Sequence, residues 1–274
     1  MIAVQMQAQA AEQKAAPHAP VLLVQPCAAC GRPWNELAAR EGLYYEAIEF
    51  YMPPVSEAPS DRERTCTWYR SSGRSRALHG AFVGIDPASG DEQIRTLSQM
   101  RCRESCELAL MLGAERIVFH SSAFPFLRGA YLDNWVGLCA EFYMALAAEY
   151  RELTVCIENS QDLDPEPLEA LIGRTDGRVR VCLDIGHARY SGTPLPVWFE
   201  RLGSRIACLH LSDNHGRFDD HLPLGAGSVD WTLADRLWRQ LGGELPLTLE
   251  VGGLHAVEQS LTYLKQHGYF GLEA

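Results

Sequence analysis

The sequence predicts one α/β domain folded as a closed (β/α)8 barrel, and three observations support this prediction. The chain has 274 residues without an obvious midpoint linker, and a barrel of this class needs about 250. Short apolar segments alternate with longer amphipathic segments, a pattern typical of a parallel sheet with helical crossovers. No G-x-G-x-x-G sequence follows an early strand, as an open dinucleotide-binding sheet would favour.

The predicted elements follow one another in regular order along the chain. The strands are expected at residues 21–25, 44–50, 77–83, 116–120, 153–158, 179–184, 206–211 and 245–250. The helices are expected at residues 34–41, 91–112, 134–150, 165–172, 194–202, 231–241 and 256–266. Gly42 and Gly113 should end two of these helices, because glycine readily adopts the left-handed conformation found there. Residues 53–76 are too polar for a core and are predicted to form a long loop over one face.

Composition and charge limit the functions open to the chain. The net charge of −11 argues against broad nucleic-acid binding, which needs Lys and Arg to neutralise phosphates, although a local metal-lined groove stays open. No apolar segment approaches the roughly 20 residues that span a bilayer, so no membrane partner is expected. Residues 1–19 lack a basic segment followed by an apolar one and are predicted to be a flexible leader before a barrel over residues 20–274.

The nine cysteines indicate a reducing compartment, and the chain is predicted to be cytoplasmic. Their odd number and irregular spacing are unlike a secreted disulfide framework. Cys156, Cys182 and Cys208 fall in predicted strands, where cysteine acts as a small hydrophobic residue. Cys27 and Cys30 form a C-x-x-C pair, a spacing used for metal or redox chemistry, but no second pair accompanies them.

Strongly polar side chains interrupt the apolar strands at their C-terminal ends. In a barrel these ends surround one mouth, so residues far apart in the sequence are expected to converge there. A buried carboxylate is costly unless it is paired or binds a metal, and facing carboxylates raise one another's pKa unless a cation lies between them. The residues are Glu49, His79, His120, Glu158, Asp184, His187, His210 and Glu250. Each alone is compatible with an ordinary structural role, but together they predict a divalent metal site.

The segment after the seventh predicted strand is the richest in polar residues. Residues 210–231 contain three histidines, four aspartates and one arginine. A solvated polar loop is the plain alternative, but long ordered loops are usually functional. Gly225 and Gly227 form a glycine pair that could bind phosphate, because barrels often hold phosphate after strands seven and eight. Glu49 and Arg217 are expected to point toward the mouth and to touch the substrate.

These motifs resemble those of the xylose isomerase-like barrel superfamily, which joins sugar and sugar phosphate isomerases and epimerases with endonuclease IV. The matching segments are HGAF at His79, IVFH at His120, CIEN at Glu158, CLDIGH at Asp184 to His187, HLSDN at His210, DDHLPLGAGSVDW from Asp219 and TLEV at Glu250. They span the third to the eighth predicted strand in the right order. Their combination is specific to the superfamily but not to one substrate.

The resemblance implies a divalent metal ion (Zn, Mn, Mg or Co) held by Glu158, Asp184, His210 and Glu250. In the isomerase and epimerase branch this set binds adjacent oxygens of a ketose, with the two glutamates on opposite sides of the substrate. The endonuclease IV branch adds five ligands and holds three zinc ions. The matching positions in this chain are His79, His120, His187, Asp219 and His221. The loop GAFVGIDPAS, which follows the HGAF histidine, does not resemble the DNA-penetrating loop of endonuclease IV, and this favours the isomerase branch.

The leading hypothesis is therefore isomerisation or epimerisation of a small sugar or sugar phosphate. One of Glu158 and Glu250 would remove the proton α to a carbonyl and the other would return it, through an enediolate that the metal stabilises. The alternative is an endonuclease IV-like multi-zinc phosphodiesterase acting on abasic-site DNA. A third hypothesis is a metal-binding barrel without catalysis. The superfamily often pairs barrels, so a homodimer is also open.

Overall fold

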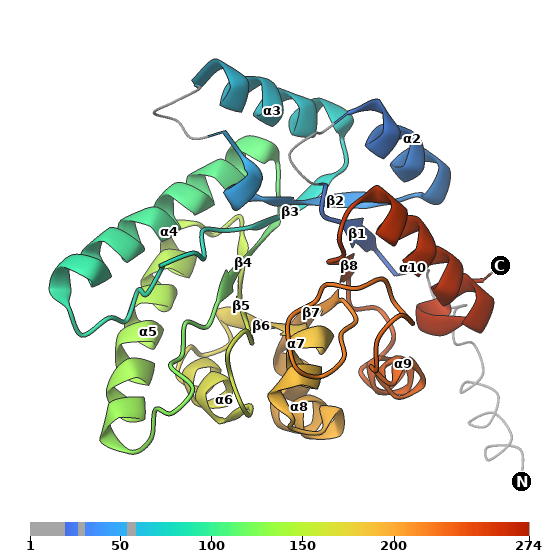
Figure 1. Ribbon diagram of the computed structural model, residues 1–274. Coiled ribbons are helices and arrows are strands. Elements are labelled where there is room, and N and C mark those ends of the chain that lie inside the picture. Colours follow the sequence, from blue (N-terminus) through green and yellow to red (C-terminus); the bar gives the residue numbers. More distant parts are fainter. Residues whose placement is uncertain (1–19, 27–30, 54–58, 274) are drawn as a thin grey trace, which may run out of the picture.

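Eight parallel strands pair in sequence order and close on themselves, with helices arranged around them (Figure 1). The computed structural model describes residues 20–26, 31–53 and 59–273. The strands are β1 (Leu22–Val24), β2 (Tyr44–Ile48), β3 (Ser75–His79), β4 (Arg116–His120), β5 (Thr154–Glu158), β6 (Val179–Asp184), β7 (Ile206–Leu211) and β8 (Leu247–Leu249). β8 pairs with β1 and completes the barrel. The predicted single-domain (β/α)8 barrel is confirmed.

The helices connect successive strands on the outside of the barrel (Figure 1). They are α2 (Arg32–Glu41), α3 (Pro59–Ser72), α4 (Glu92–Leu112), α5 (Ala130–Glu149), α6 (Glu166–Gly173), α7 (Ile185–Ser191), α8 (Leu195–Leu202), α9 (Trp231–Gln240) and α10 (Leu254–His267). Three 3-10 turns are η1 (Glu49–Tyr51), η2 (Gly203–Arg205) and η3 (Tyr269–Gly271). Gly42 and Gly113 cap α2 and α4 in the left-handed conformation, as expected.

The prediction of a long loop over residues 53–76 is wrong, because most of this segment forms helix α3. The helix is polar and has few apolar side chains with which to contact the rest of the protein. Cys66 and Tyr69 are buried and, being three residues apart, lie on one face. Trp68 stacks on Tyr45 of β2 with 5.1 Å between ring centroids. So sparse an apolar face gives a weak periodic signal in the sequence.

Other elements also differ from the prediction, and two of these differences concern residues of the candidate site. β3 runs over Ser75–His79, whereas a strand was expected at 77–83, so His79 ends the strand instead of interrupting it. The short helix α7 was not expected. It begins directly after Asp184, whose side chain accepts a hydrogen bond from the backbone N–H of His187, an N-cap that stabilises the first turn.

Side chains along each strand alternate between the helices and the barrel interior, as the strand pleat requires. On β4 and β5, for example, Ile117 and Ile157 belong to the large core that packs the helices against the barrel. Val118 and Cys156 belong instead to a separate small cluster, which lies inside the barrel. The polar residues at the strand ends have the same parity as this inner cluster, so they face inward.

Some expectations concern parts of the chain that the structure leaves aside. The predicted leader at residues 1–19 and the Cys27–Cys30 pair lie outside the described residues, so both stay predictions. In the described ranges no helix is both long and apolar enough to cross a membrane.

Candidate metal centre

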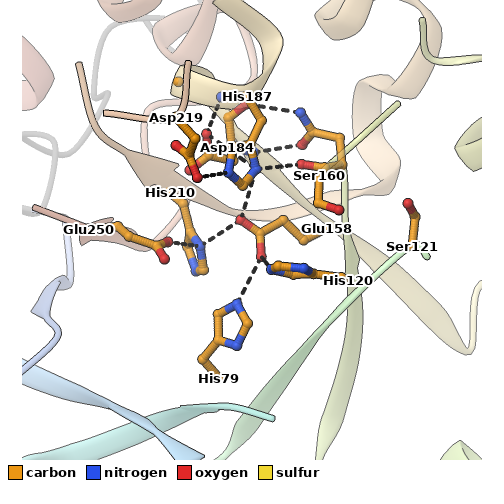
Figure 2. Close-up of polar contacts among 12 residues, drawn as sticks. His79, His120, Ser121, Glu158, Ser160, Asp184, His187, His210, Asp219 and Glu250 are labelled. Atoms are coloured by element: carbon orange, nitrogen blue, oxygen red, sulfur yellow. Dashed lines mark hydrogen bonds and ion pairs between the residues drawn. The ribbon is translucent and has the colours of Figure 1, made fainter. Parts of the chain in front are cut away.

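The barrel brings the predicted polar residues of β3 to β8 together at one end. His79, His120, Glu158 and Asp184 are the last residues of β3, β4, β5 and β6, while His210 lies near the end of β7. Figure 2 shows the Glu158 carboxylate at the centre, with imidazole rings of histidines from different elements around it. The convergence expected from barrel geometry is therefore found.

Four of these side chains form a compact quartet at the floor of the mouth: Glu158, Asp184, His210 and Glu250. One potential ligand atom from each lies within 4.8 Å of the others. The Nδ1 atom of His210 is 3.0 Å from Glu158 Oε1 and 2.6 Å from Glu250 Oε2. This set of three carboxylates and one imidazole suits divalent ions such as Mn, Mg or Zn.

A second group lies on the other side of Glu158. The Nε2 atom of His79 is 3.2 Å from Glu158 Oε2, and that of His120 is 3.7 Å from the same oxygen. The ligand atoms of His79, His120 and Glu158 all lie within 4.8 Å of one another. Glu158 thus belongs to both groups, with Oε1 toward His210 and Oε2 toward His79 and His120. The Cys182 sulfur also lies within 4.8 Å of ligand atoms of Glu158 and His210.

A third group forms nearer the surface around Asp219. Its Oδ2 atom lies 3.2 Å from His187 Nε2 and 2.9 Å from His221 Nε2. His221 adopts a positive φ of 47°, which is uncommon for a residue other than glycine. The polar segment that follows β7 thus supplies two of the three members of this group, and α7 supplies His187.

Electrostatics in the quartet show how much the carboxylates depend on positive charge nearby. Burial alone raises the pKa of Glu158, but His210, His79 and His120 outweigh it and hold this pKa well below its usual range. Asp184 is also fully buried, and burial together with Glu158 and Glu250 raises its pKa to about 7 although His187 opposes the change. The carboxylates repel one another, so a cation among them would relieve the repulsion.

Several buried polar atoms of the quartet have no hydrogen-bond partner within the described part of the chain. They are Glu158 Oε2, Asp184 Oδ2, Glu250 Oε2 and His210 Nε2. Buried polar atoms are nearly always satisfied by a partner, and carboxylate oxygens left bare in this way are the donors that a divalent cation needs. The residues present therefore fit a bound divalent metal ion.

A cavity of about 460 Å³ opens above these groups. Glu250 and the histidines of the second and third groups line its floor, while Tyr51, Phe82 and Val251 contribute apolar walls. None of the cavity-lining residues that the structure describes is Lys or Arg. Enclosed cavities with apolar walls and a few polar groups are the usual form of a small-molecule site.

Two expected substrate contacts are not brought to this cavity. Glu49 lies in η1, where its carboxylate accepts hydrogen bonds from Arg101 at 2.8 Å and from Ser105 on helix α4. Arg217 is exposed and does not line the cavity. Both were chosen from their position near a strand end, and that position does not fix where a side chain points.

The glycine pair, for which phosphate binding was left open, has a structural role in the loop. The backbone N–H of Gly225 donates to Asp213 Oδ2 at 2.9 Å. A Cβ at Gly227 would lie 2.3 Å from Asp213 Oδ1, so this glycine lets the loop wrap closely around that carboxylate. Asp213 also accepts from the Trp231 indole at 2.9 Å and thereby fixes the polar segment.

Glu46 is a site residue that the sequence analysis did not identify. It lies within β2, is fully buried, and places Oε1 2.9 Å from His210 Nε2. Burial raises its pKa, but His210 outweighs this effect and lowers the pKa to about 2. The signal was available, since a glutamate in the middle of the apolar strand YYEAI needs a buried partner.

Comparisons with known proteins agree with the fold. The sequence profile of the family described as xylose isomerase-like TIM barrel matches residues 36–267. A D-tagatose 3-epimerase-like protein superposes with a TM-score of 0.73 at 23% identity, over 90% of this chain and 96% of that one. The TTHB071 protein from Thermus thermophilus, in a structure soaked with ZnCl2, superposes with a TM-score of 0.74 at 24% identity, over 89% and 96%.

A sequence relative comes from an archaeon. The uncharacterized protein MJ1311 of Methanocaldococcus jannaschii is 26% identical over 203 residues, which cover 69% of each chain. The solved structures are less than 25% identical and show a shared fold, whereas the profile covers most of the chain. The protein therefore belongs to the xylose isomerase-like TIM barrel family.

Proposed function

We propose that the protein is a divalent-metal-dependent isomerase or epimerase of a small sugar or sugar-like hydroxy ketone. The observation that carries this proposal is the quartet at the base of the cavity, where Glu158 and Glu250 both approach Nδ1 of His210, at 3.0 and 2.6 Å. Glu158, Asp184, His210 and Glu250 would hold the ion, which would polarise the carbonyl and hydroxyl oxygens of the substrate.

The two glutamates supply the proton transfers in this proposal. Glu250 lines the cavity, and its Oε2 would take the proton from the carbon α to the carbonyl. Glu158 would have to enter this step protonated and would give the proton on its Oε2 to the enediolate. Glu250 then ends the turnover protonated and Glu158 ends it ionised, and proton exchange with water resets both. Both oxygens lack a hydrogen-bond partner among the described residues. Proton transfer by a positioned carboxylate contributes about 10²- to 10⁴-fold to rate. The aromatic walls would exclude water from the enediolate.

The walls of the cavity favour an unphosphorylated substrate. The described residues that line it include no Lys or Arg, the side chains that most often pair with phosphate. The N–H of Gly225, the other candidate for a phosphate contact, already donates to Asp213. A neutral ketose with an apolar edge matches the Tyr51, Phe82 and Val251 surface best.

The test is metal content followed by a substrate panel. Protein purified without chelators should carry divalent metal. Incubation of the loaded protein with ketoses in D2O should exchange the proton on the carbon next to the carbonyl, as followed by proton NMR. Metal-loaded protein that exchanges no proton in any ketose or ketose phosphate would contradict the proposed reaction.

A second candidate function, metal-assisted phosphoester hydrolysis, is favoured by a specific observation. The first and second ligand groups share Glu158, and His187 of the third group places its Nδ1 atom 3.6 Å from Glu158 Oε1. Enzymes that hydrolyse phosphoesters commonly use two or three metals about 3.5–4 Å apart. Two or three zinc ions per chain together with cleavage of abasic-site DNA would establish this function instead. About one ion per chain and proton exchange in a ketose would support the first.

A further inference from the structure

Four histidines of the metal centre, His79, His187, His210 and His221, are held in two different ways. Three of them direct Nδ1 to a backbone carbonyl: His79 to Gly80 at 3.1 Å, His187 to Asn159 at 2.7 Å and His221 to Glu250 at 2.8 Å. A carbonyl oxygen only accepts, so the proton in each case is on Nδ1. Each ring therefore presents its Nε2 atom to the site.

His210 is the exception, because its ring is turned round. Its Nδ1 atom faces the Glu158 and Glu250 carboxylates, as Figure 2 shows. To serve as a ligand through Nδ1, the imidazole must carry its proton on Nε2. Among the described contacts, no backbone carbonyl lies within hydrogen-bonding distance of His210 Nε2. The atom that faces Nε2 is Glu46 Oε1, at 2.9 Å.

Glu46 is itself firmly held. Gln25 Nε2 donates to its Oε1 at 3.0 Å, and Thr248 Oγ1 donates to its Oε2 at 3.1 Å. All three side chains are buried, at 6% exposure or less. The carboxylate is thus fixed by neighbours on both sides, from β8 and from the residue that follows β1, before it meets the histidine. The Nε2–Oε1 contact has the distance of a hydrogen bond, although its angle is bent.

We propose that Glu46 is a positioning residue for the metal centre, which holds the proton of His210 on Nε2 and so keeps Nδ1 free as the ligand atom. Carboxylates that accept the second N–H of a metal-binding histidine commonly fix its tautomer and raise its basicity, and their loss costs about 10- to 100-fold in metal affinity or activity. Here the carboxylate performs the task that backbone carbonyls perform for the other three rings. The inference depends on the proposed metal ion but not on the reaction.

The decisive experiment compares Glu46→Gln with a matched control, Glu49→Gln. Both glutamates lie on or directly after β2 and are buried, so each variant loses one buried negative charge from the same part of the barrel. Glu49 pairs with Arg101 and Ser105 and not with a ligand. The readouts are the dissociation constant for Co²⁺, from competition with a chromophoric chelator, and the visible absorption spectrum of the Co²⁺-loaded protein.

Glu46→Gln should weaken the binding of one Co²⁺ equivalent by about 10- to 100-fold and change the spectrum, because an amide either accepts more weakly or presents an N–H to Nε2. Glu49→Gln should stay within about threefold of the wild type, with its spectrum. Equal affinity and identical spectra for both variants would overturn the proposal, as would an equal loss in both.

A second variant keeps the test decisive if Glu46→Gln does not fold. Thr248→Val removes the hydroxyl that holds Glu46 Oε2 but preserves the carboxylate and the volume of the side chain. It should weaken Co²⁺ binding by about threefold to tenfold and shift the spectrum in part. Wild-type affinity and spectrum in Thr248→Val, with Glu46→Gln unfolded, would mean that Glu46 serves only the fold. A Co²⁺ effect in a protein without isomerase activity would leave this inference standing while the proposed reaction failed.

Discussion

Two layers of side chains on the same three strands behave in opposite ways. The ligand layer consists of Glu158, Asp184 and His210 on β5, β6 and β7. The thiol layer consists of Cys156, Cys182 and Cys208, each two residues earlier on the same strand. All six side chains are fully buried and face the barrel interior. Two residues along a strand correspond to roughly 6.5 Å, so this short distance separates the charged side chains from the small apolar cluster below them.

Because both layers are fully buried, burial does not explain their difference. What differs is their position along the barrel axis, near the cavity or below it. The thiol layer packs with Val118 into a small apolar cluster, and burial helps to raise the pKa of the Cys182 thiol well above its usual value, which keeps it protonated. The ligand layer lies directly beneath the cavity, where its charges can meet a cation. The layers are staggered, since Glu158 pairs in register with Cys182, as the shear of a closed barrel requires.

The largest expected effect comes from Glu158→Gln, which changes the residue that two ligand groups share. The amide keeps the volume but loses the charge and one oxygen ligand. We expect the metal content to fall by at least one ion per chain and turnover of a ketose substrate to fall by at least about 10³-fold, with the circular dichroism spectrum unchanged. Glu250→Gln should have a similar effect on turnover. Full activity in either variant would refute the assignment of these glutamates as the two bases.

A buried carboxylate outside the ligand layer gives a pH effect. Asp162 accepts hydrogen bonds from Ser121 and from the backbone of Ser160, but burial outweighs them and raises its pKa from 3.8 to about 6. The folded state therefore favours the protonated form. The protonated Asp162 carboxyl stabilises the folded state fully below pH 4. About 3 kcal/mol of this stabilisation is lost as the pH rises through 6.

Asp162→Asn should remove this pH dependence, because the amide is neutral throughout. The measurement is the free energy of unfolding of both proteins by urea at several pH values between 4 and 8, with EDTA present. Relative to the wild type, the free energy of unfolding of the variant should rise by about 2–3 kcal/mol between pH 4 and pH 8. A constant difference between the two proteins across this range would show that the pKa of Asp162 is ordinary.

The sequence predicted the barrel and the meeting of polar side chains at one mouth because both depend on order along the chain. Alternation of short apolar and longer amphipathic segments requires only local patterns, and closure then places every strand end at one mouth. His79, Glu158 and Asp184 could thus be grouped without knowledge of any distance. Helix α3 was missed for the opposite reason, since its packing depends on a few side chains such as Tyr69 that meet residues distant in sequence.

The side chains that support the centre were harder to predict than the ligands themselves. Glu46 acts through a contact with a residue 164 positions later (210 − 46), and no local pattern reports such a pairing. Glu49 shows the reverse error, because its place near a strand end suggested the mouth while Arg101 and Ser105 hold it elsewhere. The direction of one side chain at the end of a strand depends on which neighbour it meets.

Gly227→Ala tests the loop that carries the third ligand group. A Cβ there would lie 2.3 Å from Asp213 Oδ1 and 2.5 Å from the Asn214 carbonyl oxygen, and both atoms are buried and hydrogen-bonded. We expect a loss of about 1–3 kcal/mol of stability from this overpacking, together with weaker metal binding at Asp219. The control is Gly90→Ala, because a Cβ there meets no atom within 4 Å, and this variant should be near neutral. Gly177 would not serve as a control, because its φ is positive.

The smallest expected effect on metal binding tests the border between the two layers. Cys156→Ser and Cys182→Ser each place a hydroxyl in an apolar interior, which should cost about 1–3 kcal/mol of stability, measured by urea unfolding, and leave the metal content unchanged. The two positions differ in one respect: the Cys182 sulfur lies within 4.8 Å of ligand atoms of Glu158 and His210, a group to which Cys156 does not belong. If Cys182→Ser alone lowers the metal content, the sulfur is a ligand and the border lies two residues deeper on β6. If neither variant does, the charged centre ends at the ligand layer, and the thiols beneath it act as small apolar side chains that seal the barrel.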